Sequence, residues 1–476
     1  MLPITDERAQ NQRYHRYHIE THSAPNIASH PSRFRVRVKK HRLALLLLKE
    51  LFHYWANMPV VLSRPCVYGV FSGPVGGFAP RSQFCVGCLR CTTQYPEMVT
   101  ISPNPDRKQL GDSYITPDQV DTIAYESETG RVPVRGAGFR GRFGGPGWDG
   151  MWTDMSEIVR PTRDGIHGRE FISTVVDIGV KPSVLDFDED GRLKGEIPRT
   201  LSLPLPMLFD IPPASVATEK LWKTLAEAAR EMETLAIVPL AEIVKYSLSG
   251  SQIIPLIASE DQVSLDKLHF EPRMIELNNW DEKLHHALRS CFADSVISLR
   301  LPFVSGFEQR LLEHARSGVG VFHLIANYHG RSPDGQFVLD LIRRAHKTLV
   351  EAGLRDEATL LGSGGITVAE HVPKAIICGL DAVALDTPLL IALQARFFGD
   401  CIDRTTSRAQ LPSNLAVEWG TQRIKNMLAS WRDQLLEVLG AMGLREVRRL
   451  RGEIGRAMFQ SDLECEAFAG IEGYGD

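Results

Sequence analysis

From about residue 200 onward, short apolar runs alternate with stretches of helical periodicity. The runs are MLFDI (207–211), LAIVP (235–239), IIPLI (253–257), RMIELN (273–278), SVISLR (295–300), GVFHLIA (320–326), ATLLG (358–362) and DAVALD (381–386). Helical patterns lie between them and are weak only after the second and third runs. This α/β alternation predicts a (β/α)8 barrel of the TIM type at residues 201–400. A doubly wound open sheet is the alternative.

Four further segments flank the predicted barrel. We expect a basic arm and a helix at 1–60, a small ferredoxin-like iron–sulfur region at 61–135, a glycine-rich lead-in at 136–200 and a helical tail at 401–476. The lead-in opens with GAGFRGRFGGPGWDGMW, where Trp148 and Trp152 favour a loop that wraps closely around something. Its position suggests a lid over the barrel mouth.

The charge of the chain is nearly balanced, with 54 basic against 58 acidic side chains and a net charge of −4. This balance gives no reason to expect nucleic-acid binding. Residues 1–44 are basic, which indicates a solvated arm or a partner-docking segment, with contact to a membrane surface or nucleic acid as the alternative. The apolar run at 43–55 is interrupted by Lys49 and Glu50 and is too short to span a bilayer. We therefore expect a cytoplasmic protein without a membrane span.

Three cysteines lie within the segment FCVGCLRCTTQYP at residues 84–96. Their spacing matches the first three ligands of a bacterial ferredoxin loop, whose fourth cysteine serves a second cluster. Here Tyr95 and Pro96 occupy that fourth position. The other cysteine of this region is in RPCVYG, so the sequence predicts one [4Fe–4S] cluster on Cys66, Cys85, Cys88 and Cys91. A structural zinc site on the same residues and a metal-free loop are the alternatives.

The predicted barrel has polar residues where its strands end. The segment GSGGI (362–366) follows the seventh run and Asp386-Thr387 follows the eighth, where barrels of this type often bind phosphate. Glycine amides and a helix starting near Val368 would contact the phosphate oxygens. Arg300 and His323 lie on the fifth and sixth runs, and we consider both as catalytic candidates. His323 is equally consistent with a hydrogen-bonded interior histidine.

Two segments resemble a known family. Residues 355–393, RDEATLLGSGGITVAEHVPKAIICGLDAVALDTPLLIAL, resemble the end of the FMN-binding synthase domain of glutamate synthase. Residues 148–182 resemble the segment leading into that domain in the short, ferredoxin-linked members. The resemblance implies an FMN-carrying barrel in which a cation at Arg300 stabilises reduced flavin. It also implies that the FMN phosphate is held by Gly362, Ser363, Gly364 and Gly365, and closed in by Asp386 and Thr387.

The chain departs from that family in several places. The segment YHGRSPDG (328–335) stands where the family has a GGTGA loop that contacts substrate. The family's glycine- and lysine-bearing insertion between the early strands is missing. Of the cysteine run after strand eight that binds a [3Fe–4S] cluster in the family, only Cys401 is present. Without an N-terminal cysteine nucleophile, we do not expect this chain alone to make glutamate from glutamine.

Three hypotheses follow. The first is an iron–sulfur flavoprotein oxidoreductase that passes electrons between the cluster and FMN, with a small substrate such as an amino acid or 2-oxo acid. The second is a catalytically degenerate barrel that serves as a scaffold or electron-transfer subunit beside a redox partner protein. The basic arm would be its docking element. A homo-oligomer is also consistent with the sequence. The third is an enzyme for another phosphate-bearing ligand, with substrate contacts from His329, Arg331 and Asp334, which a solvated loop explains equally well.

Overall fold

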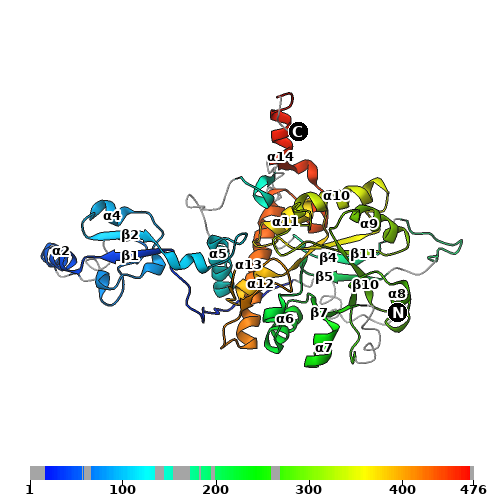
Figure 1. Cartoon of the computed structure of the whole chain (residues 1–476), viewed down its shortest axis with the longest axis horizontal. Helices are drawn as coiled ribbons and strands as arrows, with labels where there is room; N and C mark the ends of the chain where they lie inside the picture. The colour runs from blue at the N-terminus through cyan, green and yellow to red at the C-terminus, as the bar shows by residue number, and fades with distance from the viewer. Residues whose placement is uncertain are drawn as a thin grey trace, which may run out of the picture. The chain divides into compact units, whose positions relative to one another are not determined.

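The computed structural model describes residues 17–55, 57, 66–133, 144–153, 172–181, 184–194, 199–258 and 268–471. The chain divides into two compact units (Figure 1). One unit is Asn26–Asp112, and the other combines Met1–Pro25 with Ser113–Asp476. The first 16 residues of the basic arm and residues 136–143, 154–171, 182–183 and 195–198 of the glycine-rich lead-in lie outside the described residues, so the predictions for them stay predictions.

The larger unit contains a closed barrel of eight parallel strands in the order β10-β11-β12-β13-β6-β7-β8-β9. All eight predicted strands form, and the open-sheet alternative is wrong. The strands are β6 (Met207–Phe209), β7 (Ala236–Pro239), β8 (Ile253–Ile257), β9 (Met274–Leu277), β10 (Val296–Pro302), β11 (Val321–Ile325), β12 (Thr359–Ser363) and β13 (Ala382–Leu385). Most of their residues are buried, because the strands of a barrel pack against helices outside and side-chain layers inside.

Helices surround these strands in Figure 1. They are α6 (Glu219–Glu231), α7 (Leu240–Tyr246), α8 (Glu282–Cys291), α9 (Phe307–Arg316), α10 (Val338–Glu351), α11 (His371–Ile377) and α12 (Thr387–Ala392). Helix α6 illustrates why they form. The Thr218 hydroxyl caps it by accepting from the Leu221 N–H, and its apolar face buries Leu221, Trp222 and Leu225.

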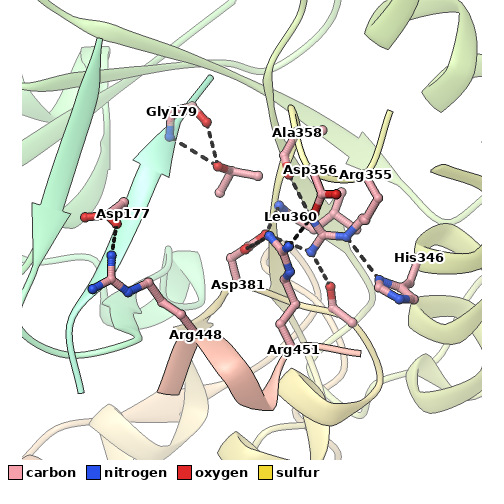
Figure 2. A network of polar contacts seen from close by, with 12 residues as sticks. Asp177, Gly179, His346, Arg355, Asp356, Ala358, Leu360, Asp381, Arg448 and Arg451 are labelled. Atoms are coloured by element: carbon pink, nitrogen blue, oxygen red, sulfur yellow. Dashed lines mark hydrogen bonds and ion pairs between the residues drawn. The ribbon is translucent and has the colours of Figure 1, made fainter. Parts of the chain in front are cut away.

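The amino ends of the barrel strands are held by an ion-pair network. Figure 2 shows Arg355 and Arg451 converging on Asp381, at 2.8 and 3.1 Å. Asp381 also accepts from the Leu360 N–H at 2.8 Å, and the Arg355 Nε donates to His346 Nδ1 at 3.0 Å. This network ties the starts of β12 and β13 to the C-terminal segment of the chain.

A hairpin packs at the same end of the barrel. It pairs β4 (Val176–Gly179) with β5 (Thr200–Leu203) in antiparallel register. The Thr359 hydroxyl donates to the Gly179 carbonyl at 2.8 Å, and the Gly179 N–H donates back at 3.2 Å. The amino end of β12 is therefore covered by the chain itself.

The chain after the barrel is helical, as predicted. Helix α13 (Val417–Ala441) packs against α6 and α5 (Pro117–Thr129), and the buried Arg423 donates to the carbonyls of Ala392 and Ala24. The remaining elements of this unit are α14 (Gln460–Ala467) and the short pairs of β3 (Met151–Thr153) with β16 (Ala457–Phe459) and β14 (Arg396–Phe397) with β15 (Ala409–Gln410).

The smaller unit is built on two antiparallel strands, β1 (Phe34–Val38) and β2 (Val99–Pro103). The helices α2 (Lys40–His53) and α4 (Arg90–Gln94) accompany them. The basic segment RFRVRVKKHR thus forms β1 and the start of α2. Among the helices in the described part of the chain, none is both long and apolar enough to cross a membrane.

Candidate functional site

Four charged or titratable side chains, three from the adjacent strands β9, β10 and β11 and one from beyond β6 on the other side of the barrel, meet toward the carboxyl ends of the strands. Asp210 directly follows β6, Glu276 lies in β9, Arg300 in β10 and His323 in β11. The sheet register places Arg300 beside His323, and Ser298 of β10 beside Glu276. Asp210, Glu276 and His323 are buried, and the Arg300 side chain is 12% exposed.

Arg300 is bound on two sides by carboxylates. Its Nε donates to Glu276 Oε1 at 2.5 Å, and its Nη2 donates to Asp210 Oδ1. His323 Nδ1 lies 2.9 Å from Glu276 Oε2, whereas its Nε2 is 4.0 Å from Asp210 Oδ2, too far for a hydrogen bond. Arg300 is therefore not a free cation, because two acids compensate its charge.

The pKa values of these groups follow their mutual contacts. Burial alone would raise the pKa of Asp210 and of Glu276, but the Arg300 guanidinium and the His323 ring outweigh it, and both pKa values are lowered. For Arg300, burial acts to lower the pKa, and the two carboxylates raise it further above its ordinary value. Both acids and the arginine are thus charged at neutral pH.

One buried ring nitrogen at this end of the barrel, His323 Nε2, has no hydrogen-bond partner among the described residues. The hydroxyl of Ser363, the last residue of β12, lies against the Asp210 carboxylate and helps to lower its pKa. Buried polar groups are nearly always hydrogen-bonded, so an orphaned ring nitrogen at the mouth of a barrel is typical of a place where a ligand supplies the missing partner.

The glycine turn after β12 is packed closely by the chain itself. Gly365 has φ +74°, and its N–H donates to the Tyr328 carbonyl at 3.1 Å. Its carbonyl accepts from the Tyr114 hydroxyl at 2.7 Å and from Trp148 Nε1 at 2.9 Å. A Cβ on Gly364, at φ +92°, would lie 2.3 Å from the Asn327 carbonyl oxygen. Close backbone packing accounts for glycine at both positions.

The helix that follows this turn starts later than predicted. We expected it near Val368, and α11 begins at His371. The Thr367 N–H, which would face a bound anion, donates instead to His371 Nδ1 at 3.1 Å. His371 is buried and stacks on Trp148, and burial, with Lys374 nearby, holds the pKa of this histidine well below its ordinary value. A neutral ring is the form that can accept this hydrogen bond.

Asp386 plays a similar part after β13. Its carboxylate accepts from the Thr387 N–H and, at 2.9 Å, from the Thr387 hydroxyl, which caps α12. Burial, with a smaller contribution from the neighbouring Asp210, raises the pKa of Asp386 to about 7. The backbone donors predicted for a phosphate at Gly365 and Thr387 are thus both occupied by acceptors of this chain.

The three predicted substrate contacts lie in the loop between β11 and α10. His329 is buried and stacks on Tyr114 with ring centroids 5.2 Å apart. Arg331 is exposed and its Nη1 donates to the Gly335 carbonyl at 2.8 Å, while Asp334 is exposed. These roles stay predictions.

The four predicted cluster ligands belong to the smaller unit. Cys85 and Cys91 are buried in its hydrophobic core, Cys66 packs against that core, and Cys88 is exposed. Burial raises the pKa of the Cys85 and Cys91 thiols, and the other thiols of the set act in the same direction. Within the described residues, no group of three or more His, Cys, Asp or Glu side chains forms a metal-binding arrangement. The cluster therefore stays a prediction.

Several residues of the site were not predicted from the sequence. Asp210 and Glu276 are each a single acid inside an apolar run, a signal that was available because a lone charge in a buried strand needs a partner. Tyr114 and Trp148 reach Gly365 from 251 and 217 residues away, and nothing local in the sequence encodes such contacts.

Comparison with protein families matches residues 331–445 to the conserved region in glutamate synthase. An archaeal-type glutamate synthase [NADPH] from Dehalococcoides mccartyi is 23% identical over 440 residues, covering 78% of this chain and 86% of that protein. The archaeal glutamate synthase [NADPH] of Archaeoglobus fulgidus is 23% identical over 468 residues, covering 82% and 89%. That of Methanocaldococcus jannaschii is 36% identical over 121 residues, which is 24% of each chain.

Among solved structures, a mandelate oxidase mutant with a monooxide FMN adduct matches with 16% identity, covering 59% of this chain and 87% of the other at a TM-score of 0.37. An IMP dehydrogenase/GMP reductase-like protein from Corynebacterium glutamicum matches with 11% identity, covering 65% and 93% at 0.39. Scores this low say nothing of ligand or reaction, and the strand order alone establishes the barrel. The sequence comparisons agree with the resemblance at 355–393 and support a glutamate synthase-related protein.

Proposed function

We propose that this protein is a flavin-dependent oxidoreductase that exchanges electrons with a [4Fe–4S] cluster and acts on a small substrate such as an amino acid or 2-oxo acid. The observation that carries the proposal is the buried polar site at the carboxyl end of a barrel from a glutamate synthase-related chain. Its relatives are named as NADPH-dependent glutamate synthases, which supports redox chemistry. Substrate sites of such barrels lie at this end of the strands.

One buried nitrogen at the barrel mouth suits the ring of a flavin. His323 Nε2 has no hydrogen-bond partner in the described part of the chain, so it is available to the polar edge of a ring system. The phosphate half fits poorly, because the N–H groups of Gly365 and Thr387 are already bonded within the chain. FMN is therefore proposed as a ligand of the mouth, without the predicted glycine cradle as its main anchor.

The residues of the mouth have definable roles. A flavin supplies an exchange of one electron with a metal cluster and two with an organic substrate. Glu276 holds the His323 ring through Nδ1, so that Nε2 is the ring nitrogen left to contact a ligand. Arg300, fixed by Asp210 and Glu276, offsets part of the negative charge of these two buried acids. Trp148 and Tyr114 hold the loop after β12 by donating to the Gly365 carbonyl.

The cysteine set fits an iron–sulfur cluster by its chemistry. All four sulfurs are free thiols of one compact unit, and backbone N–H groups of Gly87 and Thr92 point at the sulfurs of Cys85 and Cys91. Such N–H to sulfur contacts are typical of cluster loops and tune their potential. The same set of thiols also accommodates zinc, and metal analysis distinguishes the two.

One measurement tests the proposal as a whole. The full chain is purified without oxygen, and its iron, zinc and flavin are quantified beside its absorbance spectrum. We expect about four iron atoms per chain with a broad band near ~400 nm. We also expect flavin, either co-purified or bound on addition of FMN or riboflavin. Zinc alone would overturn the cluster, and failure to bind either flavin would overturn the flavoenzyme.

A second function is favoured by one specific observation. The donors of Gly365, Thr367 and Thr387 are all satisfied by acceptors of the chain, as in a barrel that has lost its phosphate ligand. In that case the protein is a scaffold or electron-transfer subunit that carries the cluster for a redox partner protein. Iron without any flavin binding is the result that would favour it.

A further inference from the structure

At the carboxyl ends of β12 and β13, where a phosphate was predicted, the chain itself places a carboxylate. Ser363 ends β12 and pairs in register with Ala384, two residues before Asp386. Asp386 is 3% exposed, and its carboxylate receives the Thr387 N–H and hydroxyl. A carboxylate on these two donors makes the contacts that a phosphate oxygen would otherwise make at the start of α12.

From this geometry we infer that Asp386 is an internal substitute for a phosphate group, which makes the barrel favour unphosphorylated ligands over phosphate esters. The inference rests on the proposed function, since the ligand considered is a flavin. It names a specificity-determining residue: FMN and riboflavin share the same ring and differ in the phosphate, and Asp386 opposes only the phosphate.

Electrostatic repulsion is the physical cause of this preference. An ionised Asp386 and a phosphate that carries nearly two negative charges repel each other strongly in a buried site. The phosphate would also have to displace the carboxylate from Thr387 to reach the same donors. When Asp386 is protonated, the repulsion disappears and the acid itself can donate a hydrogen bond to a phosphate oxygen.

The surroundings of Asp386 determine when it ionises. The titratable groups that face it are Asp210, at the end of β6, and Tyr328, in the loop after β11. Asp210 stays ionised through its pair with Arg300, and it disfavours a second negative charge nearby. Tyr328 is neutral, because burial raises the pKa of its phenol and its hydroxyl donates to the Ile211 carbonyl. Together with burial, Asp210 brings the pKa of Asp386 to about 7.

The affinity for FMN should therefore depend on pH. If FMN binding requires protonated Asp386, the dissociation constant rises about tenfold for each pH unit above 7, where the phosphate charge itself no longer changes. Riboflavin, which has no phosphate, should bind with little change between pH 6 and pH 9.

The test measures binding of FMN and of riboflavin to the full chain by calorimetry from pH 6 to pH 9. The variant is Asp386→Asn, which keeps a good N-cap for α12 while removing the charge. We expect it to bind FMN about tenfold more tightly than the unchanged protein at pH 8, without the pH dependence. Asp281→Asn is the matched control, since Asp281 caps α8 by accepting from the Leu284 N–H.

Two binding results would overturn the inference, and they differ in what they say of the proposed function. FMN binding tighter than riboflavin at every pH, unchanged by Asp386→Asn, would overturn this inference while leaving the flavoenzyme intact. Absence of binding of both flavins to both proteins would overturn the proposed function, and the inference with it. A thermal melt of Asp386→Asn that matches the unchanged protein shows that the variant is folded.

Discussion

Arg300 and Glu276 form a buried ion pair across two adjacent strands, with Arg300 Nε donating to Glu276 Oε1 at 2.5 Å inside the barrel. The pair is extended by Asp210 on the other side of the guanidinium and by His323 on the other side of Glu276. Charge compensation here is internal, so the site is built before any ligand arrives.

Removing the cation should leave Asp210 without its ion-pair partner and Glu276 with His323 alone. We expect Arg300→Met to lower the free energy of unfolding by about 3–5 kcal/mol, because Asp210 and Glu276 remain buried without their partner. Urea unfolding at pH 7 measures the change. The control is Arg230→Ala, which breaks the exposed pair with Glu227 and should leave the free energy of unfolding nearly unchanged. Equal effects of both substitutions would contradict the compensated-charge account.

The network in Figure 2 predicts a pH dependence of stability. Burial, with Arg355 and Arg451 nearby, lowers the pKa of His346 from its ordinary value near 6.5 to about 4. Between these values the unfolded chain binds a proton at His346 and the folded protein does not. The free energy of unfolding should therefore fall as the pH drops from about 6.5 to about 4.

His346→Gln separates this contribution from others. Glutamine does not titrate, and its amide oxygen can accept from the Arg355 Nε in place of the ring nitrogen. Urea unfolding at several pH values between 7 and 4 should show a shallower decline in the variant than in the unchanged protein. Asp381 does not confuse the comparison: although burial acts to raise its pKa, Arg355 and Arg451 lower it, so its contribution is lost at lower pH. Parallel pH profiles would refute the assignment.

Trp148 should be a strong determinant of stability in the described part of the glycine-rich lead-in. It is 2% exposed, donates to Gly365 and packs edge-on against Phe337. We expect Trp148→Ala to cost about 3–5 kcal/mol through the cavity it creates. Phe398→Ala, at a ring that is half exposed, should cost under about 1 kcal/mol in the same urea titration. A small effect of Trp148→Ala would show that this segment does not hold the loop after β12.

The cysteine assignment makes a separate prediction. Cys85→Ser and Cys91→Ser should each reduce the iron content from about four atoms per chain to below about one, because a thiolate ligand is lost. Iron analysis of anaerobically purified protein measures this. The matched controls are Cys291→Ser and Cys465→Ser, which alter exposed cysteines elsewhere in the chain and should leave the iron unchanged. Retention of iron by Cys85→Ser would remove that residue from the ligand set.

The barrel was predictable from the sequence because each strand is a short apolar run with a turn on either side. The interior of a closed barrel excludes water, so IIPLI and DAVALD can form only where both faces are covered. The start of α11 was predicted too early, near Val368. The sequence around Val368 has helical periodicity, but the first helical residue is His371. The Thr367 N–H donates to the His371 ring instead of a helical partner.

The candidate site was predicted in outline only. That Arg300 and His323 lie on the fifth and sixth strands, and that Asp386 directly follows the eighth, follows from counting strands, since parallel strands of a barrel all end at one rim. Their partners do not follow from counting. That Arg300 is compensated by Asp210, and that Asp386 occupies the Thr387 donors, depends on side-chain directions that no local pattern specifies.

The double hydrogen bond on the Gly365 carbonyl has a consequence for biosynthesis. Tyr114 and Trp148 leave the ribosome 251 and 217 residues before their acceptor exists. At ordinary translation speeds these aromatic side chains wait on the order of 10–50 s without their native partner. During that interval the nascent lead-in exposes a large indole ring, so chaperone engagement during translation should concentrate on this segment and end once Gly365 has emerged.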